Sequence, residues 1–93
     1  MQPSEHVIIT LSGSSTNEFI VGKAEHKTGG TFFFRLEMDS APGLSGVKGG
    51  LIRMMRIEQG GQIHYLYANG TRRFYIQGPG IEDVITELRK SFN

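Results

Sequence analysis

Short runs in which apolar and polar residues alternate recur along the chain, and they constrain the fold more than any other feature. Alternation with a period of two is typical of β-strands, because successive side chains of a strand point to opposite faces of the sheet. The runs lie near residues 6–11, 18–25, 31–38, 51–58, 62–68 and 71–77. Nothing between them is long enough to form a helical crossover, so we expect six antiparallel strands joined in chain order.

Turn-forming residues separate these runs. Asn69-Gly70 is typical of a type I′ hairpin, since both central residues of that turn need a positive φ that asparagine and glycine accept at low cost. Gly60-Gly61 indicates a second hairpin. The stretch Asp39–Gly50, with four glycines and a proline, is the longest one without a pattern of its own, and we expect it to be a loop.

After Gly78-Pro79-Gly80 the apolar period changes from two residues to 3.6, which predicts a helix over residues 81–92. Acidic residues in its first turn and basic residues in its last turn suit the helix dipole. The sequence therefore predicts one α+β domain over residues 1–93. It is an antiparallel meander of about six strands, open or curled into a half-barrel, with one C-terminal amphipathic helix.

The segment Arg72–Gln77 (RRFYIQ), followed by this amphipathic helix, resembles the end of pleckstrin-homology-like domains, in which a helix plugs one end of a half-barrel. Lipid-binding members of that superfamily use a basic loop between their first two strands. The corresponding segment here, Ser12–Glu18, contains no cation. The resemblance therefore concerns the shape of the fold and brings no ligand motif with it.

The charge and the cysteine content exclude several classes of function. The 10 Lys and Arg residues against 9 Asp and Glu leave a net charge of +1, so binding to phosphates would require the cations to gather on one face. The absence of cysteine excludes disulfides and thiolate chemistry and favours a reducing compartment. The apolar core near the N-terminus is too short for a signal peptide or a membrane span. We expect a soluble cytoplasmic protein.

No combination of residues indicates a catalytic or cofactor site. His6, His26 and His64 are far apart in the sequence, so a metal site would need three segments to converge. Lys48 follows a glycine-rich stretch but precedes a strand, whereas a phosphate-binding loop opens a helix. We therefore expect a non-enzymatic protein without cofactor or metal. An enzyme would need a pocket within a half-barrel, with the Asp39–Gly50 loop as its lid.

Apolar side chains are predicted on both faces of the sheet. Those of Phe32, Phe34, Leu36 and Met38 share one face and belong in the core. If the helix covers only that face, the other retains Ile8, Ile20, Phe33, Met55, Ile57 and Leu66. That is more apolar surface than a soluble monomer usually exposes, unless the sheet closes on itself. We therefore expect a binding module that contacts a protein partner, or a second copy in a homodimer, with the anchors Phe33, Met55, Leu66 and Tyr75.

The alternative function is single-stranded nucleic-acid binding. Arg72 and Arg73 are consecutive on a predicted strand and point to opposite faces, which predicts that Arg73 is exposed with Tyr75 while Arg72 frames the core with Phe74 and Ile76. Bases could stack on the aromatic ring while cations neutralise phosphates. The predicted nucleic-acid-binding residues are Arg53, Arg56, His64, Arg73 and Tyr75.

Overall fold

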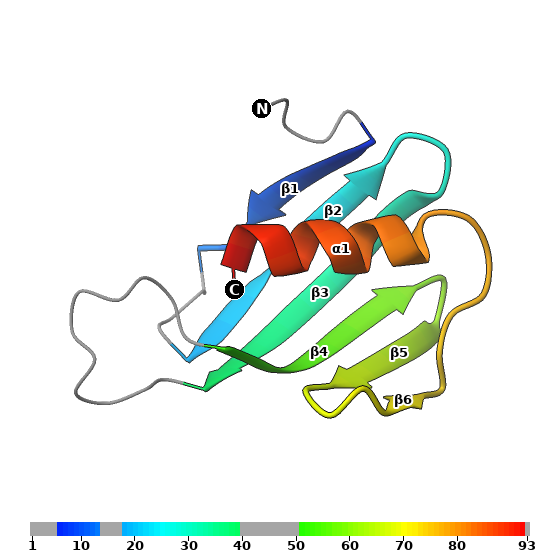
Figure 1. Cartoon of the computed structure of the whole chain (residues 1–93). Coiled ribbons are helices and arrows are strands. Elements are labelled where there is room, and N and C mark those ends of the chain that lie inside the picture. The colour runs from blue at the N-terminus through cyan, green and yellow to red at the C-terminus, as the bar shows by residue number, and fades with distance from the viewer. Residues whose placement is uncertain (1–5, 14–17, 40–50, 93) are drawn as a thin grey trace.

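The computed structural model describes residues 6–13, 18–39 and 51–92 (Figure 1). Its elements are β1 (Val7–Leu11), β2 (Phe19–His26), β3 (Gly30–Asp39), β4 (Leu51–Gln59), β5 (Gln62–Tyr67), β6 (Arg72–Arg73) and α1 (Ile81–Phe92). The strands form one antiparallel sheet in chain order, which is not closed. The predicted α+β meander with a C-terminal helix is confirmed. Most of the predicted loop, residues 40–50, lies outside the described residues.

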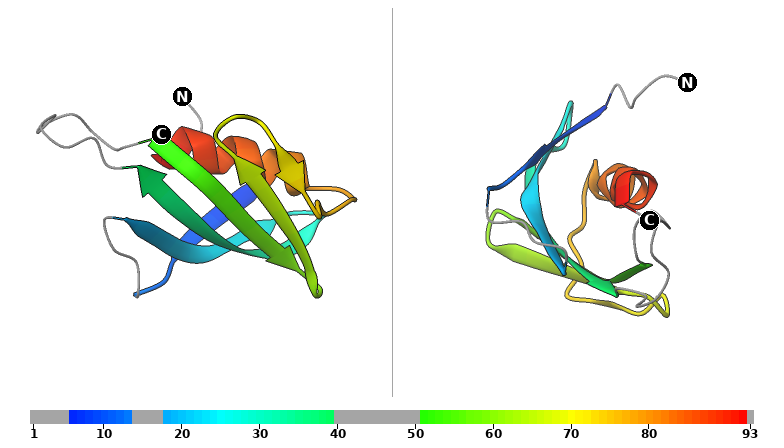
Figure 2. Two further views of the ribbon diagram at one scale, coloured as in Figure 1. Left: turned by 90° about the horizontal axis from the view of Figure 1, so that it is seen from below. Right: turned by 90° about the vertical axis from the view of Figure 1, so that its left-hand side faces the viewer.

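The sheet bends around α1, so that the helix covers only one of its two faces (Figure 2). We call the face toward α1 the inner face and the opposite one the outer face. The inner side chains of β3 are buried as predicted, and those of the apolar stripe of α1 pack against them. Together these buried residues are Phe32, Phe34, Leu36, Met38, Ile81, Val84, Ile85 and Leu88. Ile8 and Phe33 point outward, also as predicted, and are exposed.

The prediction that Met55, Ile57, Leu66 and Ile20 face outward is wrong. Leu36 of the inner face lies opposite both Ile20 and Met55 in the strand register, and Met55 lies opposite Leu66. Met55 and Leu66 are only 1% and 3% exposed. These side chains are part of the core beneath the helix.

An irregularity in the pairing of β3 with β4 explains the positions of Met55, Ile57 and Leu66. Ile20 lies on β2, and its inward position follows from its pairing with Leu36. Glu37 pairs with Met54 whereas Met38 pairs with Ile52, so Arg53 is an extra residue on β4, as in a β-bulge. An extra residue shifts the alternation of side chains by one position. Ile52 and Met55 therefore both lie in the core, although simple alternation would place them on opposite faces.

The predicted strand 71–77 is much shorter in the structure, where β6 contains only Arg72 and Arg73. It ends because Phe74 adopts a left-handed conformation with φ 50°, which strands do not contain. This conformation interrupts the alternation, so Phe74 is 71% exposed and the prediction that it faces the core is wrong. Ile76 is buried as predicted.

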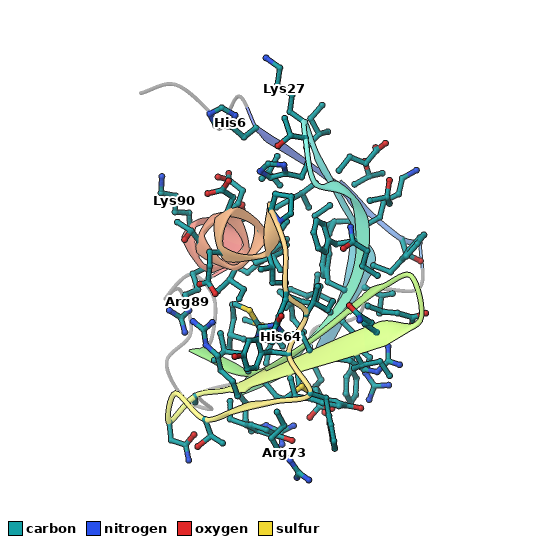
Figure 3. All side chains as sticks on the ribbon, turned by 90° about the vertical axis from the view of Figure 1, so that its right-hand side faces the viewer. His6, Lys27, His64, Arg73, Arg89 and Lys90 are labelled. Carbon is teal, nitrogen blue, oxygen red and sulfur yellow. The ribbon has the colours of Figure 1, made fainter. Side chains whose placement is uncertain are left out.

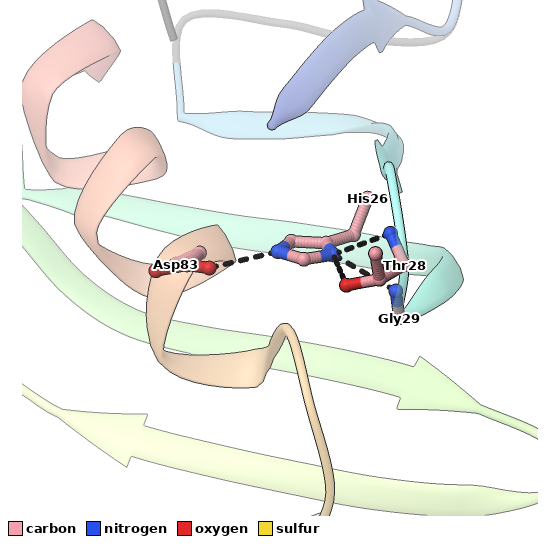
Figure 4. Close-up of polar contacts among 4 residues, drawn as sticks. All are labelled: His26, Thr28, Gly29 and Asp83. Carbon is pink, nitrogen blue, oxygen red and sulfur yellow. Dashed lines mark hydrogen bonds and ion pairs between the residues drawn. The ribbon is translucent and has the colours of Figure 1, made fainter. Parts of the chain in front are cut away.

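Two polar contacts fasten the first turn of α1 to the two halves of the sheet. His26, at the end of β2, accepts hydrogen bonds at Nδ1 from the backbone N–H groups of Thr28 and Gly29, at 3.1 and 2.8 Å. Its Nε2 therefore carries the hydrogen and donates a hydrogen bond to Asp83 Oδ2 at 2.8 Å (Figure 4). On the β6 side, the guanidinium of Arg72 donates two hydrogen bonds to the carboxylate of Glu82. Arg72 thus contacts the helix, in agreement with its predicted position beside the core.

Glycine allows the chain to pass close to this turn. A Cβ atom added at Gly29 would lie 2.4 Å from the carbonyl oxygen of Pro79, a distance that no real Cβ tolerates. A Cβ at Gly80, where φ is +98°, would lie 2.9 Å from Cγ of His26. The connection into α1 can therefore cross the β2–β3 turn only with glycine at these two positions.

Candidate binding surface on the outer face of the sheet

Aromatic side chains gather on the outer face, which α1 leaves uncovered. They come from three strands and from the residue after β6: Phe19, Phe33, Tyr65, Tyr67 and Phe74. The rings of Tyr65 and Tyr67 stack with centroids 6.4 Å apart, and Phe74 meets Tyr65 edge-on at the same distance. Phe33 lies toward the other end of the sheet and is 55% exposed. The sequence predicted only Phe33 of this group as a site residue.

A shallow groove adjoins Phe33. It has a volume of about 350 Å³ and lies between β1, β2 and β3. Its walls are mainly apolar, and Lys23 contributes a cation to its lining. The groove extends the apolar part of the outer face toward β1.

Three arginines and one tyrosine form a continuous row across this face. In the strand register Arg35 lies opposite Arg56, Arg56 opposite Tyr65, and Tyr65 opposite Arg73. We call these four residues the arginine row; neighbouring strands are ~4.8 Å apart, so the row spans roughly 14 Å. Like charges directly opposite each other weaken strand pairing. The Arg35–Arg56 pair is therefore not explained by the stability of the sheet.

Carboxylates flank the arginine row. Glu37 accepts contacts from Arg35 at 3.2 Å and from Arg53 at 3.0 Å, and Glu58 lies 3.5 Å from Arg56. The side chains of these glutamates and arginines are all partly exposed, so each pair contributes little to stability. By strand register, the outer positions of the described strands hold five cations (Lys23, Arg35, Arg53, Arg56 and Arg73) and four carboxylates (Glu25, Glu37, Asp39 and Glu58). It is therefore positively charged.

Guanidinium groups also lie over aromatic rings. The Arg35 guanidinium carbon is 5.0 Å from the centroid of Phe19, and that of Arg73 is 5.3 Å from Phe74. Such cation–π contacts are worth about 0.5–1 kcal/mol at exposed positions. They hold the planar groups against the sheet while the N–H donors at their edges still reach solvent.

Neither the predicted partner-binding residues nor the predicted nucleic-acid-binding residues all lie on one face of the structure. Phe33 lies on the outer face, whereas Met55 and Leu66 are in the core. Tyr75 is 55% exposed, but its ring packs edge-on against the inner residue His64 at 5.7 Å, away from the outer face. Of the residues predicted for nucleic-acid binding, Arg53, Arg56 and Arg73 share the outer face.

His64 is the predicted site residue whose position differs most. It is 0% exposed and lies between the sheet and the segment that leads into α1, whereas Arg73 points away from the molecule (Figure 3). Its Nδ1 accepts a hydrogen bond from the backbone N–H of Ile76 at 3.2 Å, and Nε2 has no partner among the described residues. Burial, and next the charge of Arg72, lower the pKa of His64, although Glu82 opposes this effect. His64 therefore supplies no positive charge to the outer face.

Little in the sequence indicates that Tyr65, Tyr67 and Phe74 belong to the outer face. Tyr65 and Tyr67 alternate correctly, but their face becomes known only when β5 is paired with β4. Phe74 follows an alternating run and should point inward, and only its backbone conformation reverses it. The stacking of Arg73 on Phe74 depends on that same conformation.

Three further observations concern other classes of function. In residues 6–13, 18–39 and 51–92, no group of three or more His, Cys, Asp or Glu side chains is placed to hold a metal ion. The single helix in this part of the chain is too short and too polar to cross a membrane. No protein family, curated protein or solved structure matches the chain.

Proposed function

We propose that the protein is a small non-enzymatic binding module that contacts a protein partner through the outer face of its sheet. The observation that supports this most is the cluster formed by Tyr65, Tyr67 and Phe74 beside the arginine row. Interface cores are enriched in tyrosine, phenylalanine, methionine and arginine, and depleted in lysine and acidic residues. Tyrosine and arginine are also among the residues that contribute most to binding energy.

The backbone at Phe74 gives independent support. A left-handed conformation costs a residue with a side chain roughly 1–2 kcal/mol, and glycine or asparagine usually occupies it. Here it directs a large aromatic ring toward solvent next to Tyr65. Strained conformations concentrate at functional sites. A binding role for the exposed ring accounts for a conformation that the core does not require.

Selection from a library of random peptides displayed on phage tests the proposal. Peptides that bind the wild-type protein should lose at least about tenfold in affinity for Phe74→Asn or Tyr65→Ser, because both variants remove rings of the outer face. Tyr75→Asn is the matched control, since it removes an exposed ring on the other side of the sheet. Circular dichroism would verify that the variants fold.

Two outcomes would contradict the proposal. One is the absence of any enriched peptide, and the other is a set of peptides that bind the wild type and both outer-face variants equally. A second copy of the chain is the other protein partner that we expected. Sedimentation velocity over a range of concentrations would detect such a homodimer, which Phe74→Asn should dissociate.

Single-stranded nucleic acid is the second candidate, because the arginine row combines cations with Tyr65. Stacking on such a ring contributes ~1–3 kcal/mol per base, and phosphate contacts make affinity fall steeply with salt. Fluorescence anisotropy of a labelled oligothymidylate at increasing salt measures both effects. Absence of binding at low salt eliminates this candidate and leaves the protein-binding proposal unchanged.

A further inference from the structure

We infer that the arginine row recognises carboxylates, so that the protein partner presents an extended acidic segment to the outer face. This inference rests on the proposed function and specifies the chemistry of its partner. It follows from the charge of the face, from the hydrogen-bond donors that the row leaves available, and from the spacing of the cations.

The distribution of charge favours an anionic ligand at this face. The chain is nearly neutral, with a net charge of +1, and among the described residues five of its 10 basic and four of its 9 acidic residues occupy outer strand positions. Two further acidic residues, Glu82 and Asp83 at the start of α1, bind Arg72 and His26. The outer face therefore has a small excess of positive charge, and three of its cations belong to the arginine row.

The arginine row keeps most of its donors available to a ligand. A guanidinium has five N–H donors, and the fork that two of them form matches a carboxylate. Among the described residues, Arg35 and Arg56 each form one hydrogen bond to a carboxylate, that of Glu37 and Glu58, which lie two residues further along the same strands. The carboxylates thus flank the row and do not separate its arginines. No described carboxylate lies within ion-pair distance of Arg73, whose guanidinium lies over Phe74.

The same arrangement favours a peptide over a nucleic acid. A nucleic-acid strand carries a negative charge at every nucleotide and would bring phosphates close to Glu37 and Glu58, which repel them. An extended peptide places alternate side chains on one side at ~6.6 Å intervals, so its carboxylates can meet the arginines selectively. Its apolar side chains can then contact Tyr67 and Phe74. Cations on adjacent strands are separated by about 4.8 Å, and those on either side of Tyr65 by about twice that distance.

Anisotropy with three fluorescent probes tests the inference. The first is a peptide in which glutamate alternates with valine and tyrosine, the second has glutamine in place of every glutamate, and the third is an oligothymidylate of similar length. The acidic peptide should bind the wild-type protein at least about tenfold more tightly than the glutamine peptide, as expected for hydrogen bonds to charged groups.

Two triple variants with equal charge locate the effect. Arg35→Gln/Arg56→Gln/Arg73→Gln removes the cations of the row, and Lys27→Gln/Arg89→Gln/Lys90→Gln removes three exposed cations from the β2–β3 turn and α1, away from Arg73 (Figure 3). The first variant should abolish the preference for the acidic peptide. The second variant should retain the preference for the acidic peptide, although the long-range attraction between protein and peptide decreases equally in both variants.

Several results would overturn the inference. They are equal binding of the two peptides, equal loss of the preference in both triple variants, binding of the oligothymidylate as tight as that of the acidic peptide, and no binding of any probe. In each case peptides selected from the random library that depend on Tyr65 and Phe74 would still support the proposed function. Failure of that selection contradicts the proposed function itself.

Discussion

A single residue, His64, shows how the structure changes the chemistry expected from the sequence. The side chain lies fully inside the molecule and accepts a backbone hydrogen bond through Nδ1. A protonated imidazole has no acceptor nitrogen, so protonation of His64 would remove the bond to Ile76 and place a charge in the core. The lowered pKa of His64 agrees with this geometry.

Protonation of His64 should make stability depend on pH. Because its pKa in the folded protein is below the ordinary value of 6.5, the unfolded chain binds more protons as the pH falls. The stability contributed by neutral His64 is complete above pH 6.5 and is lost as the pH falls through the folded-state pKa. The expected slope from this one group is at most about 1.4 kcal/mol per pH unit.

Urea unfolding at pH values from neutral to mildly acidic measures this slope. His64→Gln retains an acceptor for the Ile76 N–H and cannot be protonated, so its free energy of unfolding should decrease less over the same range. If wild type and His64→Gln lose stability in parallel, other groups cause the pH dependence and this interpretation of His64 is wrong.

At the scale of secondary structure, α1 is positioned by contacts at its first turn as well as by its apolar stripe. Glu82 and Asp83 lie where the helix dipole favours negative charge, and each also binds a side chain from the sheet. The Asp83–His26 contact joins residues that are 57 positions apart. The amphipathic pattern predicts the helix and its buried face, but not this contact.

Asp83→Ala should lower the free energy of unfolding by about 1–3 kcal/mol, because it leaves the buried Nε2–H of His26 without an acceptor. Asp83→Asn should cost less, since an amide oxygen can still accept that hydrogen bond. Glu87→Ala removes a carboxylate from the same helix and should change stability by less than about 0.5 kcal/mol. Thermal and urea unfolding provide the comparison, and equal losses in Asp83→Ala and Glu87→Ala would show that the contact contributes nothing.

In the molecule as a whole, the two faces of the sheet differ in which side chains they carry. The inner face and α1 form the hydrophobic core, while the outer face carries the aromatic cluster and the arginine row. The greater part of the apolar surface expected on the outer face is inside, yet large apolar side chains remain exposed there. The binding surface therefore remains a proposal, and it now consists of the aromatic cluster and the arginine row.

A pair of truncations tests the assignment of the faces. Met55→Ala should cost about 2–5 kcal/mol of unfolding free energy, because it leaves a cavity in the core. Phe33→Ala should cost less than about 1 kcal/mol, since the ring is more than half exposed. Equal costs in chemical unfolding would mean that the two faces are wrongly assigned.

Local patterns in the sequence suffice to predict the number and order of the strands, the hairpins and the helix over residues 81–92. These features depend on local chemistry: alternation over a few residues, the turn-forming tendency of Asn69-Gly70, and apolar spacing along one helix. Each is encoded within a short stretch, so no knowledge of distant contacts was needed. The predicted type I′ geometry of that turn is wrong, because Gly70 has a positive φ of 91° whereas Asn69 does not.

Which side chains lie on each face of the sheet depends on how the strands pair. Arg53 is accommodated as an extra residue when β4 pairs with β3, and Phe74 reverses its direction when β6 ends. Both events shift an alternation with a period of two, so a change at one residue moves side chains between core and surface. The positions of Met55 and His64 inside therefore depend on the pairing of β4 with its neighbours, whereas the outward position of Phe74 depends on its own backbone conformation.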